Sequence, residues 1–343
     1  MRNNAVSRAA DAGHRLQRRQ ALCLGATTLA ALAACAFSRH ANAARDGVLR
    51  LLCSGPAGSI PDLVARAVAE QLLATAGLRA LVDNKPGAAG RLSVNALKTA
   101  PSDGSTLLLA QGAIATVYPF LYAKLGYDPA LDLQPVSLAS EMSLGLAVGP
   151  AVPAAVATLA DWIEWVRRNP AAANVGSPGT GTLPHLLAEM LLRGAGVAWQ
   201  HIAYSGGPPA VNDLLGGQIA ALVLPEGLLR QHHVARRIRV LATSGPTRST
   251  YMPEVPSFVE QGRADLVVKE WFAFFAPSAT PKDTVASLAL TLRDAISRPE
   301  LSAVFAAAGM TAVSSTTPLL AERIASEQRY WQPVLRALGI NAE

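Results

Sequence analysis

Hydrophobic and polar positions change rhythm repeatedly along the chain, and the changes predict strands and helices in alternation. Segments 48–53, 80–82 and 106–110 are short apolar runs of the kind that form buried strands. Between them, segments 62–73 and 91–99 carry apolar residues at the i, i+4 spacing of a helix that buries one face. The order strand, helix, strand, helix, strand predicts a parallel sheet covered by helices.

The same rhythm restarts further along the chain. The predicted strands there are 144–148, 173–175, 199–202, 219–224, 238–243 and 272–275, and the predicted helices are 158–168, 184–193 and 208–215. The closing helices, 282–297, 299–308 and 318–338, lack strands of their own and must pack back on an earlier unit. We therefore expect an α/β fold of two lobes, each a mostly parallel sheet covered by helices, with a ligand cleft between the lobes. We expect lobe 1 to comprise residues 44–142 plus 271–343, and lobe 2 to comprise residues 143–270.

Residues 1–43 have the pattern of an export signal peptide. A cationic head precedes an apolar run from Ala21 to Ala36, and Ala41-Asn42-Ala43 forms a small-x-small cleavage site. Arg18-Arg19 followed by Gln-Ala-Leu resembles a twin-arginine signal, so export by the Sec or the Tat route stays open. Leu32-Ala33-Ala34-Cys35 resembles a lipobox, which would make Cys35 a lipidated N-terminus, although we favour cleavage after Ala43. Both alternatives predict a periplasmic protein.

The formal charge of +6 is concentrated in this signal, which holds six arginines and one aspartate. The rest of the chain carries 24 basic and 23 acidic residues, so no basic face argues for binding to nucleic acid. Of the three cysteines, Cys53 alone remains after cleavage at Ala43. A single thiol cannot form a disulfide framework, so the apolar core has to supply the stability.

One short phrase occurs twice, as GSIPDLVARAV at 58–68 and as GTLPHLLAEML at 181–191. In each copy a hydroxyl residue stands at the N-cap position of the predicted helix, and a proline follows in the first turn. Each copy follows a Gly-rich loop at the end of a strand, where free N–H groups and the positive helix end attract anions. A solute with two carboxylates could be held at both ends, one lobe to each; the alternative is that Gly-hydroxyl-x-Pro is only a common strand-to-helix turn. The ligand-binding candidates from these loops are Ser54, Gly58, Ser59, Ser177, Gly179, Thr180 and Thr182.

Three further residues are ligand-binding candidates because of their position. Gln111 follows a predicted strand whose carboxyl end points at the same crevice, and Tyr204 precedes a Gly-containing loop that could line it. His185 lies near a predicted helix start, where the neutral ring is favoured, either as a ligand contact or as a brace for loop 176–182.

The sequence offers little for catalysis, and we expect no enzyme, no metal and no cofactor. Nucleophile-elbow and phosphate-binding-loop motifs are absent from the sequence. His232 and His233 are adjacent, so they do not share a helix face on which to bind a metal. A periplasmic hydrolase is an alternative of a different class, in which Ser59 or Ser177 would need His185 beside it as the base.

Longer phrases spread over the mature chain resemble those of one receptor family. They include Asn84-x-Pro86-Gly87-Ala88-x-Gly90, Asp103-Gly104-x-Thr106-Leu107-Leu108, Gly176-Ser177-Pro178-Gly179-x-Gly181-Thr182, Asp213-Leu214-Leu215-Gly216-Gly217-Gln218 and Trp271-Phe272-x-x-Phe275-Ala276-Pro277. In their order and spacing they resemble the Bug-type solute receptors of tripartite tricarboxylate transporters. The resemblance implies a two-lobed periplasmic binding fold, type II-like, in a monomer that closes on a small organic acid and hands it to membrane permease subunits.

Two departures from the family pattern leave the ligand open. The family's first loop usually carries an aromatic residue and a second glycine, where this chain has Gly55 and Ser59. An acidic residue usual after Gln218 is missing from the apolar stretch 219–224, so a ligand amino group would lack that partner. A ligand-binding sensor for a membrane kinase is an alternative use of the same lobes.

Overall fold

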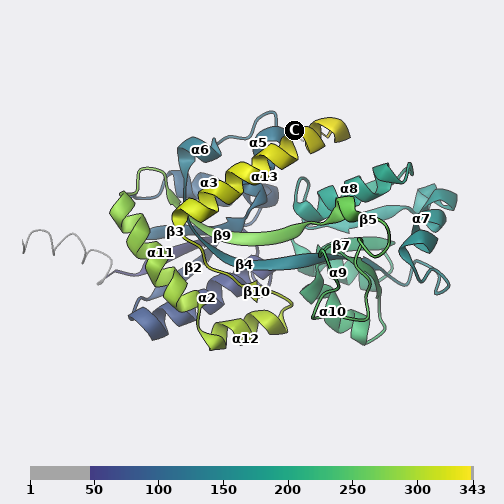
Figure 1. Cartoon of the computed structure of the whole chain (residues 1–343), viewed down its shortest axis with the longest axis horizontal. Helices are drawn as coiled ribbons and strands as arrows, with labels where there is room; N and C mark the ends of the chain where they lie inside the picture. The colour runs from purple at the N-terminus through teal and green to yellow at the C-terminus, as the bar shows by residue number, and fades with distance from the viewer. Residues whose placement is uncertain (1–46, 341–343) are drawn as a thin grey trace, which may run out of the picture. The chain divides into compact units, whose positions relative to one another are not determined.

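Strand β1 (Leu49–Cys53) is the centre of the first parallel part of the sheet. It pairs in parallel with β2 (Ala80–Asn84) on one side and with β3 (Thr106–Gln111) on the other. Helices α2 (Ile60–Ala76) and α3 (Arg91–Lys98) make the crossovers between these strands (Figure 1). β1 and β3 are buried at all but one position each, as befits strands with helices on both faces.

The structure, a computed structural model, describes residues 47–340. The export signal predicted for residues 1–43, with Arg18-Arg19 and Cys35, lies outside the described residues. Within residues 47–340, no helix combines the length and the apolar character that crossing a bilayer requires.

A second parallel part of the sheet follows further along the chain. β5 (Asn174–Ser177) pairs in parallel with β6 (Gln200–Ala203) and β7 (Ala221–Pro225). The helices of this part are α7 (Leu159–Arg168), α8 (Leu183–Gly194), α9 (Gly207–Leu215) and α10 (Glu226–Val234). The sequence pattern does not predict α10, because its segment EGLLRQHHV has too few apolar residues to show a helical period.

Two antiparallel strands join the two parallel parts. β4 (Leu133–Val148) pairs with β9 (Lys269–Pro277) as far as Ser143, and from Leu144 onward it pairs with β7 and with β8 (Arg239–Thr243). Figure 1 shows β4 and β9 running side by side between the two groups of helices. The strand order is β2-β1-β3-β9-β4-β7-β5-β6, with β8 and the short β10 (Thr311–Ala312) paired to β4.

The closing helices α11 (Lys282–Ile296), α12 (Pro299–Ala307) and α13 (Thr317–Leu338) return to the first part of the sheet. Leu288 and Leu292 of α11 share one apolar core with Val64 and Val68 of α2. α13 contacts β4 and two short helices after β3, α4 (Ala113–Thr116) and α5 (Tyr118–Leu121), and buries Trp331 in a second core. α11 and α13 therefore pack back on the first part of the sheet and its helices.

Candidate ligand-binding site

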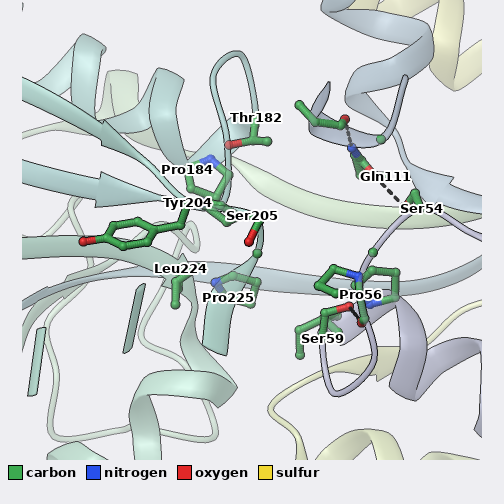
Figure 2. Close-up of a pocket in the computed structure, with 18 of the residues that line it drawn as sticks. Ser54, Pro56, Ser59, Gln111, Thr182, Pro184, Tyr204, Ser205, Leu224 and Pro225 are labelled. Carbon is green, nitrogen blue, oxygen red and sulfur yellow. Dashed lines mark hydrogen bonds between the residues drawn. The ribbon is translucent and has the colours of Figure 1, made fainter. Parts of the chain in front are cut away.

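A cavity of about 340 Å³ lies where loops from both parts of the sheet meet. Its lining residues are Ser54, Gly55, Pro56, Ser59, Ile60, Pro61, Gly87, Ala88, Ala89, Gly90 and Gln111 from the first part, Pro178, Thr182, Pro184, Tyr204, Ser205, Gly206, Gly207, Leu224, Pro225 and Leu228 from the second, and Glu270 and Phe272 from β9. Figure 2 shows the two groups facing each other across the cavity. None of these lining residues is a lysine, arginine or histidine. The size suits a small molecule, and any negative charge on that molecule must be met by hydrogen-bond donors rather than by cations.

The two copies of the echoed phrase fold into the same hydrogen-bonded turn. In the first, the hydroxyl of Ser59 donates to the carbonyl oxygen of Pro56 at 2.5 Å, and the Ser59 amide donates to the same oxygen at 3.2 Å. In the second, the hydroxyl of Thr182 donates to the carbonyl oxygen of Gly179 at 2.7 Å, and its amide does so at 3.3 Å. The preceding glycines, Gly58 and Gly181, have φ values of 77° and 81°, which favour glycine in both copies.

A side chain four residues on completes each turn. The Gly58 amide donates to a carboxylate oxygen of Asp62 at 3.0 Å, and the Gly181 amide donates to Nδ1 of His185 at 3.1 Å. The sequence prediction of hydroxyl N-caps is wrong in this respect, since neither Ser59 nor Thr182 accepts a cap hydrogen bond through its side chain. The hydroxyls point back into the loops instead. The first-turn N–H groups of α2 and α8 are thus left without a side-chain cap at the cavity.

Gln111, at the end of β3, fixes two loops of the cavity to each other. Its Oε1 accepts from the Ser54 hydroxyl at 2.9 Å, and its Nε2 donates to the carbonyl oxygen of Ala89 at 2.7 Å (Figure 2). The hydroxyl of Tyr118 donates to the same Ala89 oxygen at 2.9 Å. Both polar atoms of the Gln111 side chain are therefore used in positioning the wall of the cavity.

The loop that Gln111 holds is strained. Its turn η1 (Ala88–Gly90) has Ala88 and Ala89 at φ values of 47° and 53°, a left-handed conformation that residues with a Cβ seldom adopt. Gly90 follows at 89°, and a Cβ there would approach Nε2 of Gln111 to 2.7 Å. Such strain persists where surrounding contacts enforce it, and it concentrates at ligand sites. Here both Ala88 and Ala89 line the cavity.

Two histidines support the second loop from behind. His185 and His201 stack with ring centroids 3.8 Å apart, and Nε2 of His201 lies 2.7 Å from the Ser177 hydroxyl. Burial lowers the pKa of His201 to about 4, and burial together with His201 lowers the pKa of His185 to about 3. Both rings are therefore neutral at physiological pH, which agrees with Nδ1 of His185 accepting the Gly181 amide. The pair braces the loop rather than supplying positive charge.

Comparison with known proteins decides the family. The family model described as "Tripartite tricarboxylate transporter family receptor" matches residues 64–340. The chain belongs to this receptor family. BugT of Bordetella pertussis is 31% identical over 292 residues, covering 85% of this chain and 89% of BugT. A Pseudomonas sp. (strain P51) protein from the tcbD-tcbE intergenic region is 30% identical over 288 residues, 84% of this chain and 85% of its own.

Solved structures place this family receptor in the expected fold. A structure described as a periplasmic transporter has a TM-score of 0.81 at 29% identity and covers 86% of this chain and 98% of its own. The periplasmic binding protein BugD gives a TM-score of 0.81 at 25% identity, over 87% of this chain and 99% of BugD. The predicted two-lobed α/β binding fold is confirmed, as are the assignment to the Bug-type receptors and the expectation of a solute-binding receptor that is not an enzyme.

The structure divides the predicted site residues of this receptor into two groups. Ser54, Ser59, Gln111, Thr182 and Tyr204 line the cavity. Gly58, Ser177, Gly179, Thr180 and His185 are not among its lining residues. They make contacts behind it: the Thr180 carbonyl oxygen, for example, accepts from the Tyr122 hydroxyl at 2.8 Å. For the hydrolase alternative, Ser177 has His201 beside it instead of His185, and its buried hydroxyl faces Gly179.

Sequence reasoning missed several lining residues of the receptor. The turn 88–90 was visible only as a Gly-rich family phrase, and nothing local marks Ala88 and Ala89 as cavity residues. Glu270 and Phe272, two residues apart on β9, also line the cavity. The sequence signal that could have found them is an acidic residue directly before the aromatic pair Trp271-Phe272 in an apolar strand. Tyr204 was expected and lines the cavity, but its hydroxyl donates to Asp213 at 2.8 Å and is thus already used within the second part of the sheet.

Proposed function

We propose that the chain captures a small carboxylate-bearing solute in the cavity between its lobes and delivers it to the permease subunits of a tripartite transporter. The observation that carries this proposal is the pair of identical turns, each placing an uncapped helix start at one cavity from opposite sides. Helix starts of this kind bind carboxylates through N–H groups and the positive end of the helix dipole. The R. palustris relative Rpa4515, 25% identical with a TM-score of 0.81, has been solved with adipate.

The proposal includes lobe 1 as residues 44–142 plus 271–343 and lobe 2 as residues 143–270. These boundaries are supported by the pairing of β4, which pairs with β9 up to Ser143 and with β7 and β8 from Leu144 onward. The two lobes would close on the solute as a hinge at β4 and β9 bends. The Tyr122 hydroxyl of lobe 1 donates to the Thr180 carbonyl oxygen of lobe 2, and the Arg91 guanidinium lies over the Tyr122 ring, so lobe closure would have a polar as well as an apolar component.

We further propose that the mature receptor is a periplasmic monomer, exported by the Sec or the Tat route. Cleavage after Ala43 would release it, and lipidation at Cys35 would anchor it to the membrane. Its partners would be the solute and the permease, with no nucleic acid involved.

A thermal-shift screen of the mature protein tests the proposal. A solute that binds only the folded state at about 100 times its Kd adds about 2.7 kcal/mol, which is about 5 °C for a protein of this size. We expect such a shift with one or more of a set of mono-, di- and tricarboxylates, and none with matched uncharged amides. Equal shifts with acids and amides, or hydrolysis of a model ester without any shift, would contradict the proposed function.

A further inference from the structure

Glu270 is a buried acidic side chain that lines the cavity, with the Trp271 backbone as a hydrogen-bonding neighbour and no cationic partner among residues 47–340. It lies two residues before Phe272 on β9, so the strand's alternation puts both on one side, and both line the cavity. Trp271 between them points away and donates its indole N–H to Glu327 at 2.7 Å. Glu270 is only 4% exposed, and within residues 47–340 its Oε1 has no hydrogen-bond partner.

The charged groups around Glu270 do not compensate a negative charge on it. On α13, Glu327 contributes a second negative charge to the surroundings of Glu270, and its carboxylate is paired with Arg323 at 2.9 Å. From β4, Glu141 is paired with Arg323 and lies 3.8 Å from Lys269, so both nearby cations are engaged elsewhere. From α5, the Tyr118 hydroxyl is committed to Ala89. An ionised Glu270 would therefore be a buried, unpaired charge.

The carboxyl avoids this by keeping its proton. Burial, followed by the charge of Glu327, raises the pKa of Glu270 to about 8. At neutral pH the side chain is then a carboxylic acid with one O–H donor and free acceptor capacity. A buried polar group without a partner is unfavourable, so an unsatisfied carboxyl that lines the cavity favours a ligand that supplies an acceptor.

We propose that Glu270, as a neutral acid, donates its O–H to an acceptor oxygen of the bound solute and thereby sets the receptor's specificity. The inference rests on the proposed function, because it takes the solute to be an anion held at the α2 and α8 helix starts. A donor at Glu270 favours acids that carry a second hydrogen-bond acceptor, such as a distal carboxylate. It also disfavours solutes with an ammonium group at that position, since their binding would require Glu270 to release its proton.

Three acids of one chain length separate these classes. Adipate, hexanoate and 6-aminohexanoate share one carboxylate and differ at the other end by a carboxylate, a methyl group or an ammonium group. We expect calorimetric titration of the mature receptor at pH 7 to give the order adipate, then hexanoate, then 6-aminohexanoate. Adipate remains fully ionised from pH 7 to pH 9, so its affinity should fall about tenfold over this range as Glu270 loses its proton.

Substitutions at Glu270 identify the group that titrates. Glu270→Gln keeps a neutral donor, so adipate affinity at pH 7 should stay within about threefold of the parent and lose its dependence on pH. Glu270→Leu removes the donor and should abolish the preference for adipate over hexanoate. Glu322→Gln, an exposed carboxyl on α13, is the matched control and should keep the full pH dependence.

The outcomes are distinct. Tightest binding of 6-aminohexanoate with loss of that binding in Glu270→Gln would overturn the proposal in favour of an ion pair with a cationic ligand. A flat pH profile in the parent, or an unchanged adipate preference in Glu270→Leu, would overturn it as well. If the melting curve shows that Glu270→Leu does not fold, the pH dependence of adipate affinity in the parent and in Glu270→Gln tests the proposal without it. Absence of binding by all three acids at millimolar concentration would count against the proposed function itself.

Discussion

Replacing Gly181 with alanine should weaken ligand binding without an equal loss of fold stability. Gly181 has a φ of 81°, and a Cβ at this position would overlap Cδ2 of Leu121 and approach the Tyr122 hydroxyl to 3.3 Å. Leu121 and Tyr122 follow β3 in the first part of the sheet, whereas Gly181 precedes α8 in the second. With the proposed lobe boundaries the clash is between the two lobes, and lobe opening would relieve it.

The echoed turn supplies a matched control for the magnitude. Gly58 has a φ of 77°, nearly the same as Gly181, but a Cβ there meets nothing within 4 Å. Gly58→Ala should thus show only the backbone cost of a left-handed alanine, about 1 kcal/mol. Gly181→Ala carries the same cost plus an overpacking term of about 1–3 kcal/mol, which is present only in the closed form. That term converts to a loss of affinity of about fivefold to about 150-fold.

Urea unfolding of the free protein and calorimetric titration with the best acid of the screen measure the two effects separately. We expect both variants to lose similar unfolding free energy and only Gly181→Ala to lose much affinity, with less compaction on binding by X-ray scattering. Equal affinity losses in the two variants would refute a specific contact between lobes. A larger stability loss in Gly181→Ala with unchanged affinity would show that the contact belongs to the fold and not to closure.

Three further predictions concern protonation, loop charge and export. The pKa of Glu270 rises from 4.5 to about 8 on folding, so the folded state holds a proton that the unfolded state loses, and stability should fall as pH rises between these values. The slope from this group is at most about 1.4 kcal/mol per pH unit, and urea unfolding at several pH values should show it in the parent but not in Glu270→Gln. At pH 8, His185→Asn should keep affinity within about threefold, because its amide oxygen can still accept the Gly181 amide, whereas His185→Asp should weaken anion binding about tenfold. Replacing Arg18 and Arg19 with lysine should block export only on the Tat route, and the intact mass of the exported chain distinguishes a start at Ala44 from a lipidated Cys35.

Local periodicity predicted most helices and strands of this receptor, because each buries an apolar stripe that can be recognised within its own segment. It failed for the first part of β4, where Pro135, Ser137 and Ser140 interrupt the apolar pattern. The register of β4 against β9 shifts after Pro135 and again before Ser140, so the strand accommodates these residues at irregularities. The Ser137 hydroxyl is buried and accepts the amide of Ser315, which is far away in sequence. A strand completed by partners so distant leaves no local signal.

The same limit applies to the site. The two loops were predictable because a helix start needs its glycine, hydroxyl and proline within a few residues of each other. The sequence could not predict which atoms of those loops line the cavity. His185 and Ser177 are residue types that often contact ligands, but here they form hydrogen bonds within and behind the loop. The role proposed for Glu270 depends on the charge of Glu327 in α13 and on cavity loops from both parts of the sheet. Its significance therefore emerges only from the assembled structure.

The two copies of the repeated sequence form turns of the same geometry, but the side chain that accepts the glycine amide is charged in one copy and neutral in the other. In the first turn the residue that accepts the glycine amide is Asp62, whose carboxylate is paired with Arg66 at 3.0 Å. In the second it is His185, whose lowered pKa of about 3 keeps it neutral. A carboxylate in the first turn of α2 already occupies part of that helix's positive end, whereas α8 leaves its end to the ligand. The charged end of a solute should therefore be held more strongly at α8. The rest of the solute would then contact the α2 loop and the proposed Glu270 donor, which line the same cavity.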